Sequence, residues 1–140
     1  MSVNAKEYLM QIRRLNDLIK SNRRRIEELE SDIAGIRAID YSGVRVQSTK
    51  GDALADSVAR LSDMKCELAM QMVELQEKKN KILQEIRRIP DTDCVDILTY
   101  RYVDCDRWED VEERMGRTVR QLHRIQKRAY EEFEKLSITE

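Results

Sequence analysis

A chain of 140 residues is long enough for one ordinary domain, or for one domain with an appendage, which excludes a large multidomain enzyme. Hydrophobic residues make up 41% and charged residues 38%, with only 4 Gly and 1 Pro, a balance that favours long solvated helices over a β-sandwich or a doubly wound sheet. The net charge is -1, so a nucleic-acid partner would have to meet a local basic patch rather than the surface as a whole.

The first quarter of the chain carries an unbroken heptad repeat. Its spacings alternate between four and three residues, the pattern of a coiled-coil helix. Asn4 followed by Glu7 resembles a capping box at the start, and Ser42-Gly43 marks the end, so we expect a helix over residues 5–39. The repeat consists of Tyr8, Ile12, Leu15, Ile19, Asn22, Ile26, Leu29, Ile33 and Ile36.

A second heptad repeat follows a stretch that is rich in Gly and Ser. Residues 40–51 predict a connecting loop, and Asp52 is a plausible N-cap for a helix over 52–89 that Pro90 ends. Two helices of similar length joined by a short connection favour an antiparallel coiled-coil hairpin over residues 1–89. The second repeat consists of Leu54, Val58, Leu61, Lys65, Leu68, Met72, Leu75, Lys79, Ile82, Ile86 and Ile89.

Three polar residues interrupt these two repeats. Asn22, Lys65 and Lys79 stand at positions where a coiled coil usually has apolar side chains, and such residues fix register and partner number. We favour that role for Asn22, whereas the lysines could equally extend their charged ends to solvent. The second helix also has apolar residues off its repeat, which predicts that a second chain or the C-terminal domain covers it. We therefore expect a homo-oligomer, with a dimer favoured.

After Pro90 the pattern changes to short helices, which predicts a separate domain over residues 90–140. We expect a small three-helix bundle in which Gly116 ends one short helix and Thr118 with Gln121 forms a capping box for the last. A short helix, a tight break and a capped second helix is the layout of a helix-turn-helix. The predicted fold class is thus all-α, a long hairpin followed by a helix-turn-helix domain.

Residues 114–128 contain six Lys and Arg and no acidic residue, within a C-terminal region, 91–140, whose net charge is -4. At about 100° per residue, the cations of the last helix fall opposite its apolar side chains, where a major groove could receive them. Arg117 and Thr118, in the turn and at the helix start, would meet phosphate oxygens. The candidate DNA-binding residues are Arg117, Thr118, Val119, Arg120, Gln121, His123, Arg124, Lys127 and Arg128.

The alternative interpretation of this basic segment is a solvated face with no partner. Residues 104–113 are strongly acidic and could neutralise the neighbouring cations. The break at Gly116 and the capping box that follows it are typical of a helix-turn-helix, so we favour double-stranded DNA as the partner.

Candidate catalytic and metal-binding residues are scarce. His123 is the single histidine, and Cys66, Cys94 and Cys105 have no CxxC spacing, so we expect no enzyme, no metal site and no cofactor. No apolar run approaches the roughly 18 residues that cross a bilayer. The first residues also lack the apolar segment of a secretory signal, so we expect a cytoplasmic protein without membrane contact.

The C-terminal region resembles region 4 of bacterial sigma factors over about residues 94–136. The whole chain is similar to small sigma-region-4-like proteins of phages and prophages, which carry an N-terminal coiled coil. The resemblance lies in the strings Arg101-Tyr102, Trp108-Glu109-Asp110-Val111, Met115-Gly116-Arg117-Thr118 and Gln121-Leu122-His123-Arg124-Ile125-Gln126-Lys127-Arg128-Ala129.

The resemblance implies a DNA-binding transcriptional regulator of phage or prophage type, with RNA polymerase as a second candidate partner. By position, Val119, Arg120, Gln121, His123 and Arg124 correspond to the groove-facing residues of the sigma module. Sigma factors often have an acidic residue where Arg120 stands and a basic one where Val119 stands, so a standard promoter element is not the expected site. Sigma regions that melt promoters or bind the polymerase core have no counterpart here, so an autonomous sigma factor is not expected.

Two other classes of function stay open on the sequence alone. In the first, the coiled coil is the working surface of a structural or adaptor protein, and the C-terminal bundle only caps it. In the second, the chain is a phage DNA-packaging component, a class that also joins helix-turn-helix modules to oligomerising coiled coils. The position of the module at the end of the chain disfavours packaging.

Overall fold

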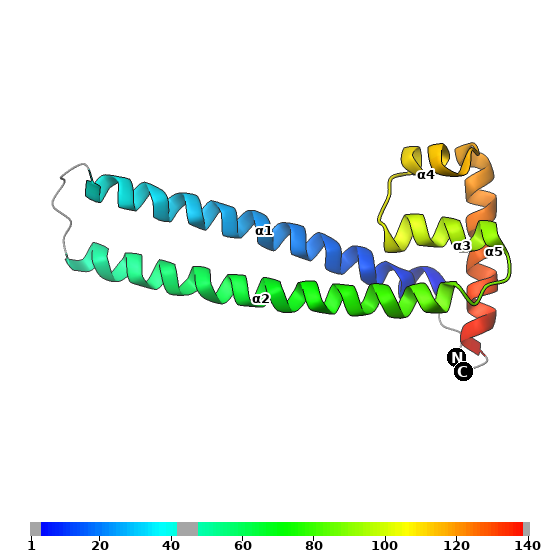
Figure 1. Cartoon of the computed structure of the whole chain (residues 1–140), viewed down its shortest axis with the longest axis horizontal. Helices are drawn as coiled ribbons and strands as arrows, with labels where there is room; N and C mark the ends of the chain where they lie inside the picture. Colours follow the sequence, from blue (N-terminus) through cyan, green and yellow to red (C-terminus); the bar gives the residue numbers. More distant parts are fainter. Residues whose placement is uncertain (1–3, 42–47, 139–140) are drawn as a thin grey trace. The chain divides into compact units, whose positions relative to one another are not determined.

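The computed structural model describes residues 4–41 and 48–138, and all of its regular structure is helical. No strand occurs in these two ranges, and none of their helices combines the length and the apolar run that crossing a membrane would need. In chain order the elements are α1 (Ala5–Tyr41), α2 (Ser48–Ile86), α3 (Thr92–Leu98), the π-helical segment η1 (Thr99–Val103), α4 (Trp108–Met115) and α5 (Val119–Ile138), as labelled in Figure 1.

The chain divides into two compact units. Unit 1 comprises Met1–Asn16 and Leu75–Glu140, and unit 2 is Asp17–Glu74. Both long helices therefore contribute to both units. A division at Pro90 separates the two long helices from the rest, whereas this grouping places the beginning of α1 and the end of α2 with the C-terminal helices.

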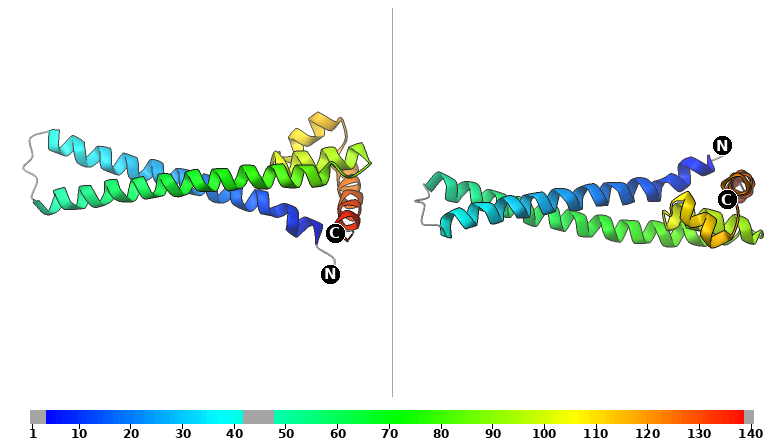
Figure 2. Two further views of the ribbon diagram at one scale, coloured as in Figure 1. Left: turned by 60° about the horizontal axis from the view of Figure 1, so that its bottom comes forward. Right: turned by 90° about the horizontal axis from the view of Figure 1, so that it is seen from above.

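Unit 2 is an antiparallel pair made by α1 and α2, which run side by side in Figure 2. Ile19, Ile26 and Ile33 of α1 are buried, as the first heptad repeat predicts. Polar contacts fix the direction of the pair: Asn22 Nδ2 donates to Gln71 Oε1 at 2.7 Å, while Glu30 and Lys65, further from the unit 1 end, form an ion pair of 3.6 Å. Rising residue numbers in one helix thus meet falling numbers in the other.

The face that α2 turns to α1 differs from the predicted one. Leu54, Leu61, Leu68 and Leu75 are half-buried as expected, but three of the positions between and after them are Ser57, Met64 and Gln71 rather than Val58, Lys65 and Met72; at the fourth, Lys78 and Lys79 are both half-buried. The alternatives are adjacent residues, about 100° apart on either side of the same leucines, so α2 carries two overlapping heptad repeats.

This difference changes the prediction that Lys65 and Lys79 fix the register of the coiled coil. Lys65 is exposed at the edge of the helix pair, where it meets Glu30, so the prediction that it occupies the apolar repeat is wrong. Lys79 is half-buried, and its neighbour Lys78 donates to Gln11 Oε1 at 3.1 Å. Asn22, in contrast, lies within the repeat and is partnered by Gln71.

Unit 1 has a continuous apolar core to which every one of its helices contributes. The Tyr8 hydroxyl donates to Glu85 of α2 at 2.6 Å, and its ring lies 5.7 Å from that of Phe133 of α5. The backbone N–H of Ala5 donates to Glu134 at 3.1 Å. The buried core is formed by Ala5, Leu9, Ile12, Ile82, Ile86, Ile89, Cys94, Ile97, Leu98, Tyr102, Val103, Val111, Leu122, Ile125, Ala129 and Phe133.

The helix boundaries differ from the predicted ones by a few residues. The first helix ends at Tyr41 rather than at residue 39, and the second begins at Ser48, so Asp52 lies inside the helix instead of capping it. The second helix ends at Ile86, after which a turn leads to Pro90. The Ser42-Gly43 end signal lies outside the described residues.

Side-chain caps define the start of α3 but not that of α4. Asp91 accepts from the backbone N–H groups of Asp93 and Cys94, so two of the otherwise unpaired donors of this helix end are satisfied. The residue before α4 is Arg107, which makes no side-chain capping bond. Cys105, in the preceding turn, has a positive φ of 58°.

Candidate nucleic-acid interface

The turn between α4 and α5 begins at Gly116. This residue has a φ of 63°, the left-handed conformation that glycine adopts without steric cost, and its N–H bonds to the carbonyl of Glu112 to close the last turn of α4. Arg117 and Thr118 complete the break before α5 begins at Val119. The prediction that Gly116 ends a short helix is confirmed.

A capping box holds the start of α5. The Thr118 hydroxyl accepts from the Gln121 N–H at 3.3 Å, and the Gln121 side chain accepts from the Thr118 N–H at 3.0 Å. Two otherwise unpaired donors are thereby satisfied reciprocally, as the sequence predicts. Both side chains are exposed but engaged in the cap. Gln121 can therefore contact a partner only through side-chain atoms that form no capping bond.

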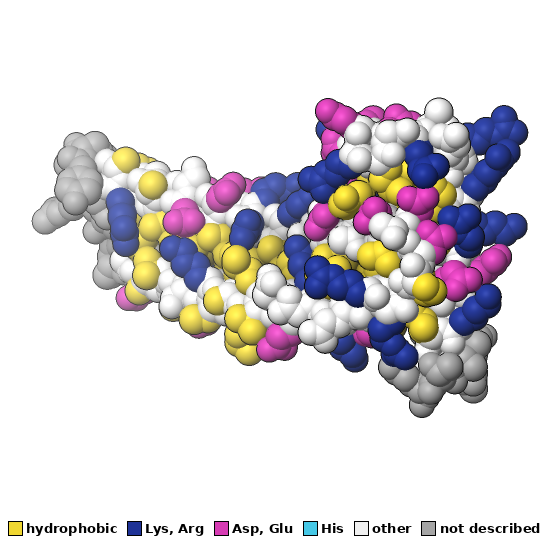
Figure 3. Space-filling model, turned by 45° about the vertical axis from the view of Figure 1, so that its right-hand side comes forward, with side chains coloured by type: hydrophobic (Ala, Val, Ile, Leu, Met, Phe, Trp, Pro, Cys, Tyr) yellow, Lys and Arg dark blue, Asp and Glu magenta, His cyan; other side chains and the backbone are white. Residues whose placement is uncertain are grey.

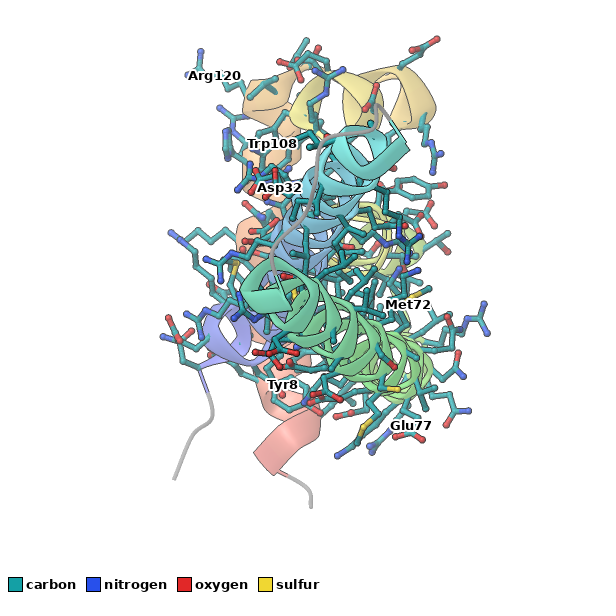
Figure 4. The ribbon with its side chains drawn as sticks, turned by 90° about the vertical axis from the view of Figure 1, so that its left-hand side faces the viewer. Tyr8, Asp32, Met72, Glu77, Trp108 and Arg120 are labelled. Carbon is teal, nitrogen blue, oxygen red and sulfur yellow. The ribbon has the colours of Figure 1, made fainter. Side chains whose placement is uncertain are left out.

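The two sides of α5 have opposite character. Leu122, Ile125 and Ala129 are buried against the rest of unit 1. Arg120, Arg124 and Lys127 are exposed, and Arg120 projects away from the ribbon in Figure 4. In Figure 3, dark blue side chains lie along the outer edge of the C-terminal helices, with magenta carboxylates between them, and others lie along the two long helices.

Half of the basic residues in 114–128 are neutralised by carboxylates. Arg114 lies 3.1 Å from Asp106 and 3.5 Å from Asp104, Arg117 lies 2.9 Å from Asp93, and Arg128 lies 2.9 Å from Asp91. The acidic partners come from the turn before α4 and from the start of α3. These are the contacts that a solvated, self-balanced basic face would make.

The other half has no such partner. Among the residues that the structure describes, Arg120, Arg124 and Lys127 form no ion pair with a carboxylate. They lie within about two turns of one another on a single exposed face. The positive charge of this face is therefore uncompensated, which the sequence alone could not decide because it did not place the acidic residues.

The last two predicted DNA-binding residues are Val119 and His123. Val119 is half-buried, so only part of its side chain is available to a partner. His123 is exposed, yet its ring centroid lies 4.7 Å from that of Trp108. The nine predicted residues thus lie within residues 117–128. They divide into three cations that form no ion pair in the described ranges, four residues held by ion pairs or the cap, the half-buried Val119, and a histidine whose ring is tilted against that of Trp108.

No pattern in the sequence indicates a second group of cations in unit 1. Arg13 of α1 donates to the backbone carbonyls of Arg101 and Asp106, at 2.9 and 3.2 Å, so it lies beside Arg101 although the two are far apart in the chain. A contact at such a separation depends on how α1 packs against η1, and neither heptad spacing nor local charge encodes it.

Potential metal-ligating side chains are dispersed among the described residues. In the described ranges, no three or more His, Cys, Asp or Glu side chains are grouped so that they could hold a metal ion. Burial raises the pKa of Cys94, which favours an inert thiol over a thiolate ligand. The exposed basic face of α5 is thus the strongest candidate site in this part of the chain. Comparison of the chain with protein-family models, with curated proteins and with solved structures gives no match.

Proposed function

We propose that this protein is a DNA-binding transcriptional regulator of phage or prophage type, in which α4, the Gly116–Thr118 turn and α5 act as a helix-turn-helix. The observation that carries the proposal is the uncompensated positive charge of Arg120, Arg124 and Lys127 on the exposed face of a capped helix. The first three turns of α5 enter the major groove of duplex DNA, which is about 12 Å wide and accommodates one helix.

The roles of the residues follow from where each one lies. The guanidinium groups of Arg120 and Arg124 form no ion pair within the described ranges, and their paired donors match the O6 and N7 acceptors of guanine. Arg117 and Thr118 lie at the helix start, where backbone donors and the helix dipole favour a phosphate. The Arg117 side chain is 41% exposed, so a DNA phosphate can replace or share Asp93 as its partner.

The distribution of acidic residues limits how much of α5 contacts DNA. Glu131 is exposed one turn beyond Lys127, and Glu132 and Glu134 follow it. A phosphate backbone would be repelled by these carboxylates, so the contact ends near Arg128. The resemblance to sigma region 4 supports the same assignment, and it extends the proposal to contact with RNA polymerase.

We further propose that the regulator is a dimer formed through the outer face of α2 in unit 2. This face carries a further heptad series, separate from the two overlapping repeats that share the leucines of α2. Its residues are uncharged and mostly small, and all of them are exposed and point away from the α1 repeat. Figure 3 shows hydrophobic side chains on the surface of the two long helices. Small side chains allow two helices to approach closely. The series is Ala55, Ala59, Ser62, Cys66, Ala69 and Val73.

Charge on the two edges of this face favours a second copy in parallel orientation. One edge bears the exposed Asp56 and Asp63, whereas the other bears Lys65 and, from α1, Arg23, whose guanidinium lies 3.5 Å from the sulfur of Met72. A two-fold axis along the helices places the acidic edge of one copy against the basic edge of the other. An antiparallel pair would place like charges together, which is destabilising.

The DNA proposal is tested by fluorescence anisotropy with the full chain and labelled duplexes at two salt concentrations. We expect binding that weakens steeply with salt, with a slope of about 0.9 per phosphate contacted, and loss of binding in Arg120→Ala/Arg124→Ala. The matched control is Arg24→Ala/Arg25→Ala, which removes the same charge from exposed positions on α1 in unit 2. Unchanged affinity in the α5 double variant would contradict the proposal.

A second candidate function rests on the same α2 face. If the protein is a coiled-coil adaptor, the exposed Met70 and Val73, which are 73% and 59% accessible, are its working surface, and DNA reading is dispensable. The full-length Arg120→Ala/Arg124→Ala variant separates the two functions in cells. An adaptor would keep its full effect, whereas a regulator would lose it.

A further inference from the structure

Unit 1 contains a pocket that the DNA-binding face does not explain. It has a volume of about 320 Å³, near the lower end of the range of roughly 300–1,000 Å³ for small-molecule sites. Its walls combine basic and aromatic side chains and include no Asp or Glu. The lining residues are Lys6, Met10, Arg13, Arg101, Tyr102, Trp108, His123, Gln126 and Tyr130.

Two guanidinium groups lie together in this pocket and are held by backbone carbonyls instead of carboxylates. Arg13 Nε and one of its terminal nitrogens donate to the carbonyls of Arg101 and Asp106, at 2.9 and 3.2 Å. Arg101 donates to the same Asp106 carbonyl at 2.7 Å. Within the described ranges neither arginine forms an ion pair with an acidic side chain, so two adjacent positive charges are not neutralised.

Arg101 is held between Trp108 and Arg13. Its guanidinium carbon lies 4.2 Å from the centroid of the Trp108 ring, which holds the group in place. Its Nε is buried and makes no hydrogen bond to any described part of the chain, although leaving a buried charged donor unpaired is costly. Burial, and then the positive charge of Arg13, lower the pKa of Arg101. An anion beside the two arginines would offset the repulsion between their positive charges.

The surroundings of the arginines indicate what kind of anion fits. Lys6 and His123 are exposed at the rim, where they add donors for a multiply charged group. Trp108 and the hydrogen-bonded hydroxyls of Tyr102 and Tyr130 form an aromatic wall. Paired guanidinium donors match the oxygens of a phosphate, and an aromatic wall can contact an attached sugar or base.

We propose that the pocket between Arg13 and Arg101 binds a phosphate group. The phosphate can belong to a free nucleotide-sized molecule or to the backbone of DNA bound by α5, since both present the same oxygens. The two arginines lie on α1 and η1, outside the proposed recognition helix, so binding of a free phosphate would not depend on the proposed reading of DNA.

The test uses Trp108, which is the single tryptophan of the chain and lines the pocket. Its fluorescence in the full-length protein is titrated with inorganic phosphate and with adenosine monophosphate at constant ionic strength, with chloride as the balancing anion. We expect a saturable change for both, several-fold weaker binding in Lys6→Gln, and loss of binding in Arg101→Gln. Lys20→Gln, on the exposed surface of unit 2, is the control for charge and should bind normally.

Because Arg101 also holds a backbone carbonyl, Arg101→Gln is used only if its circular dichroism and thermal unfolding match the parent; the Lys6→Gln result stands otherwise. A phosphate response that persists in the presence of saturating DNA indicates a free ligand. Competition between phosphate and DNA, with weaker DNA binding in Lys6→Gln, indicates the backbone. Absence of a saturable response to phosphate, nucleotide and DNA, or equal responses in Lys6→Gln and the parent, would overturn the proposal.

Discussion

Asn22 of α1 donates a 2.7 Å hydrogen bond to Gln71 of α2 within the repeat that joins the two helices. Each amide satisfies the other, so neither is left as an isolated polar group in the half-buried repeat. The adjacent residue Met72 stands where the alternative repeat would place an apolar side chain opposite Asn22. The amide pair therefore favours the observed face of α2 over the overlapping one.

A double-mutant cycle on this pair tests that interpretation. We expect Asn22→Ala and Gln71→Ala each to lower the free energy of unfolding, and the double variant to lose less than their sum. The coupling should be about 0.5–1.5 kcal/mol, the range for a neutral hydrogen bond. Urea unfolding of the four proteins measures it, and additive effects would show that the amides do not cooperate in fixing the register.

Gly116 and Gly35 provide a matched pair of glycine substitutions. A Cβ at either position meets no atom within 4 Å, so only backbone conformation separates them. Gly116→Ala should destabilise unit 1 by roughly 1–2 kcal/mol, because its φ of 63° is left-handed. Gly35→Ala should stabilise by about 0.5–1 kcal/mol, because that residue lies inside helix α1. Thermal unfolding measures both, and effects of equal sign would contradict the argument.

The proposed parallel dimer predicts a specific cross-link. A two-fold axis along α2 brings Cys66 of one copy opposite Cys66 of the other, and this thiol is exposed in the single chain. Mild oxidation should therefore yield a disulfide-linked dimer in the parent and none in Cys66→Ser. Val73→Glu should abolish both the cross-link and the dimer seen by sedimentation. A ring-sized assembly would instead favour the DNA-packaging alternative.

Buried proton-bearing groups in unit 1 predict a loss of stability in alkali. Burial raises the pKa of Cys94 above its ordinary 9.0 and that of Tyr130 above its ordinary 10.0, and the Tyr102 hydroxyl adds to the second shift. The folded chain then holds more protons than the unfolded chain, so stability is complete below about pH 9 and falls as the pH rises further.

This pH dependence is measured as the urea midpoint between about pH 8 and about pH 11. Tyr130→Phe removes one titrating hydroxyl and keeps the ring, so its midpoint should fall less steeply. A midpoint that is flat across this range in the parent would show that neither group is held in its neutral form by the fold.

The parts of the structure that the sequence predicts well are those encoded by neighbours in the chain. The repeat from Tyr8 to Ile36 predicts the inward face of α1, and Gly116 and Thr118 predict the break and the cap before α5. These signals are local, because helix periodicity and capping depend on residues within about four positions. The α2 face was ambiguous, because two repeats share the same leucines and only the partner Asn22 distinguishes them.

The candidate site was predicted only in part, for a related reason. Helical periodicity places Arg120, Arg124 and Lys127 on one exposed face, but the ion pairs that occupy Arg117 and Arg128 depend on where α3 packs. No local sequence pattern predicts the Arg13–Arg101 pair, because its two members are far apart in the chain. Contacts between distant segments are set by tertiary packing, which spacing along one chain does not encode.

The hydrogen bond from the Ala5 N–H to Glu134 joins residues 129 positions apart in the chain. Together with the packing of Tyr8 on Phe133, it makes the first turns of α1 part of the same core as the last turns of α5. A growing polypeptide cannot close this core until α5 has left the ribosome. Closing so long a loop is also slow, since the entropy cost precedes the contacts that reward it. A prematurely terminated chain would therefore expose its apolar helices to proteolysis before it could compete for the intact protein's partners.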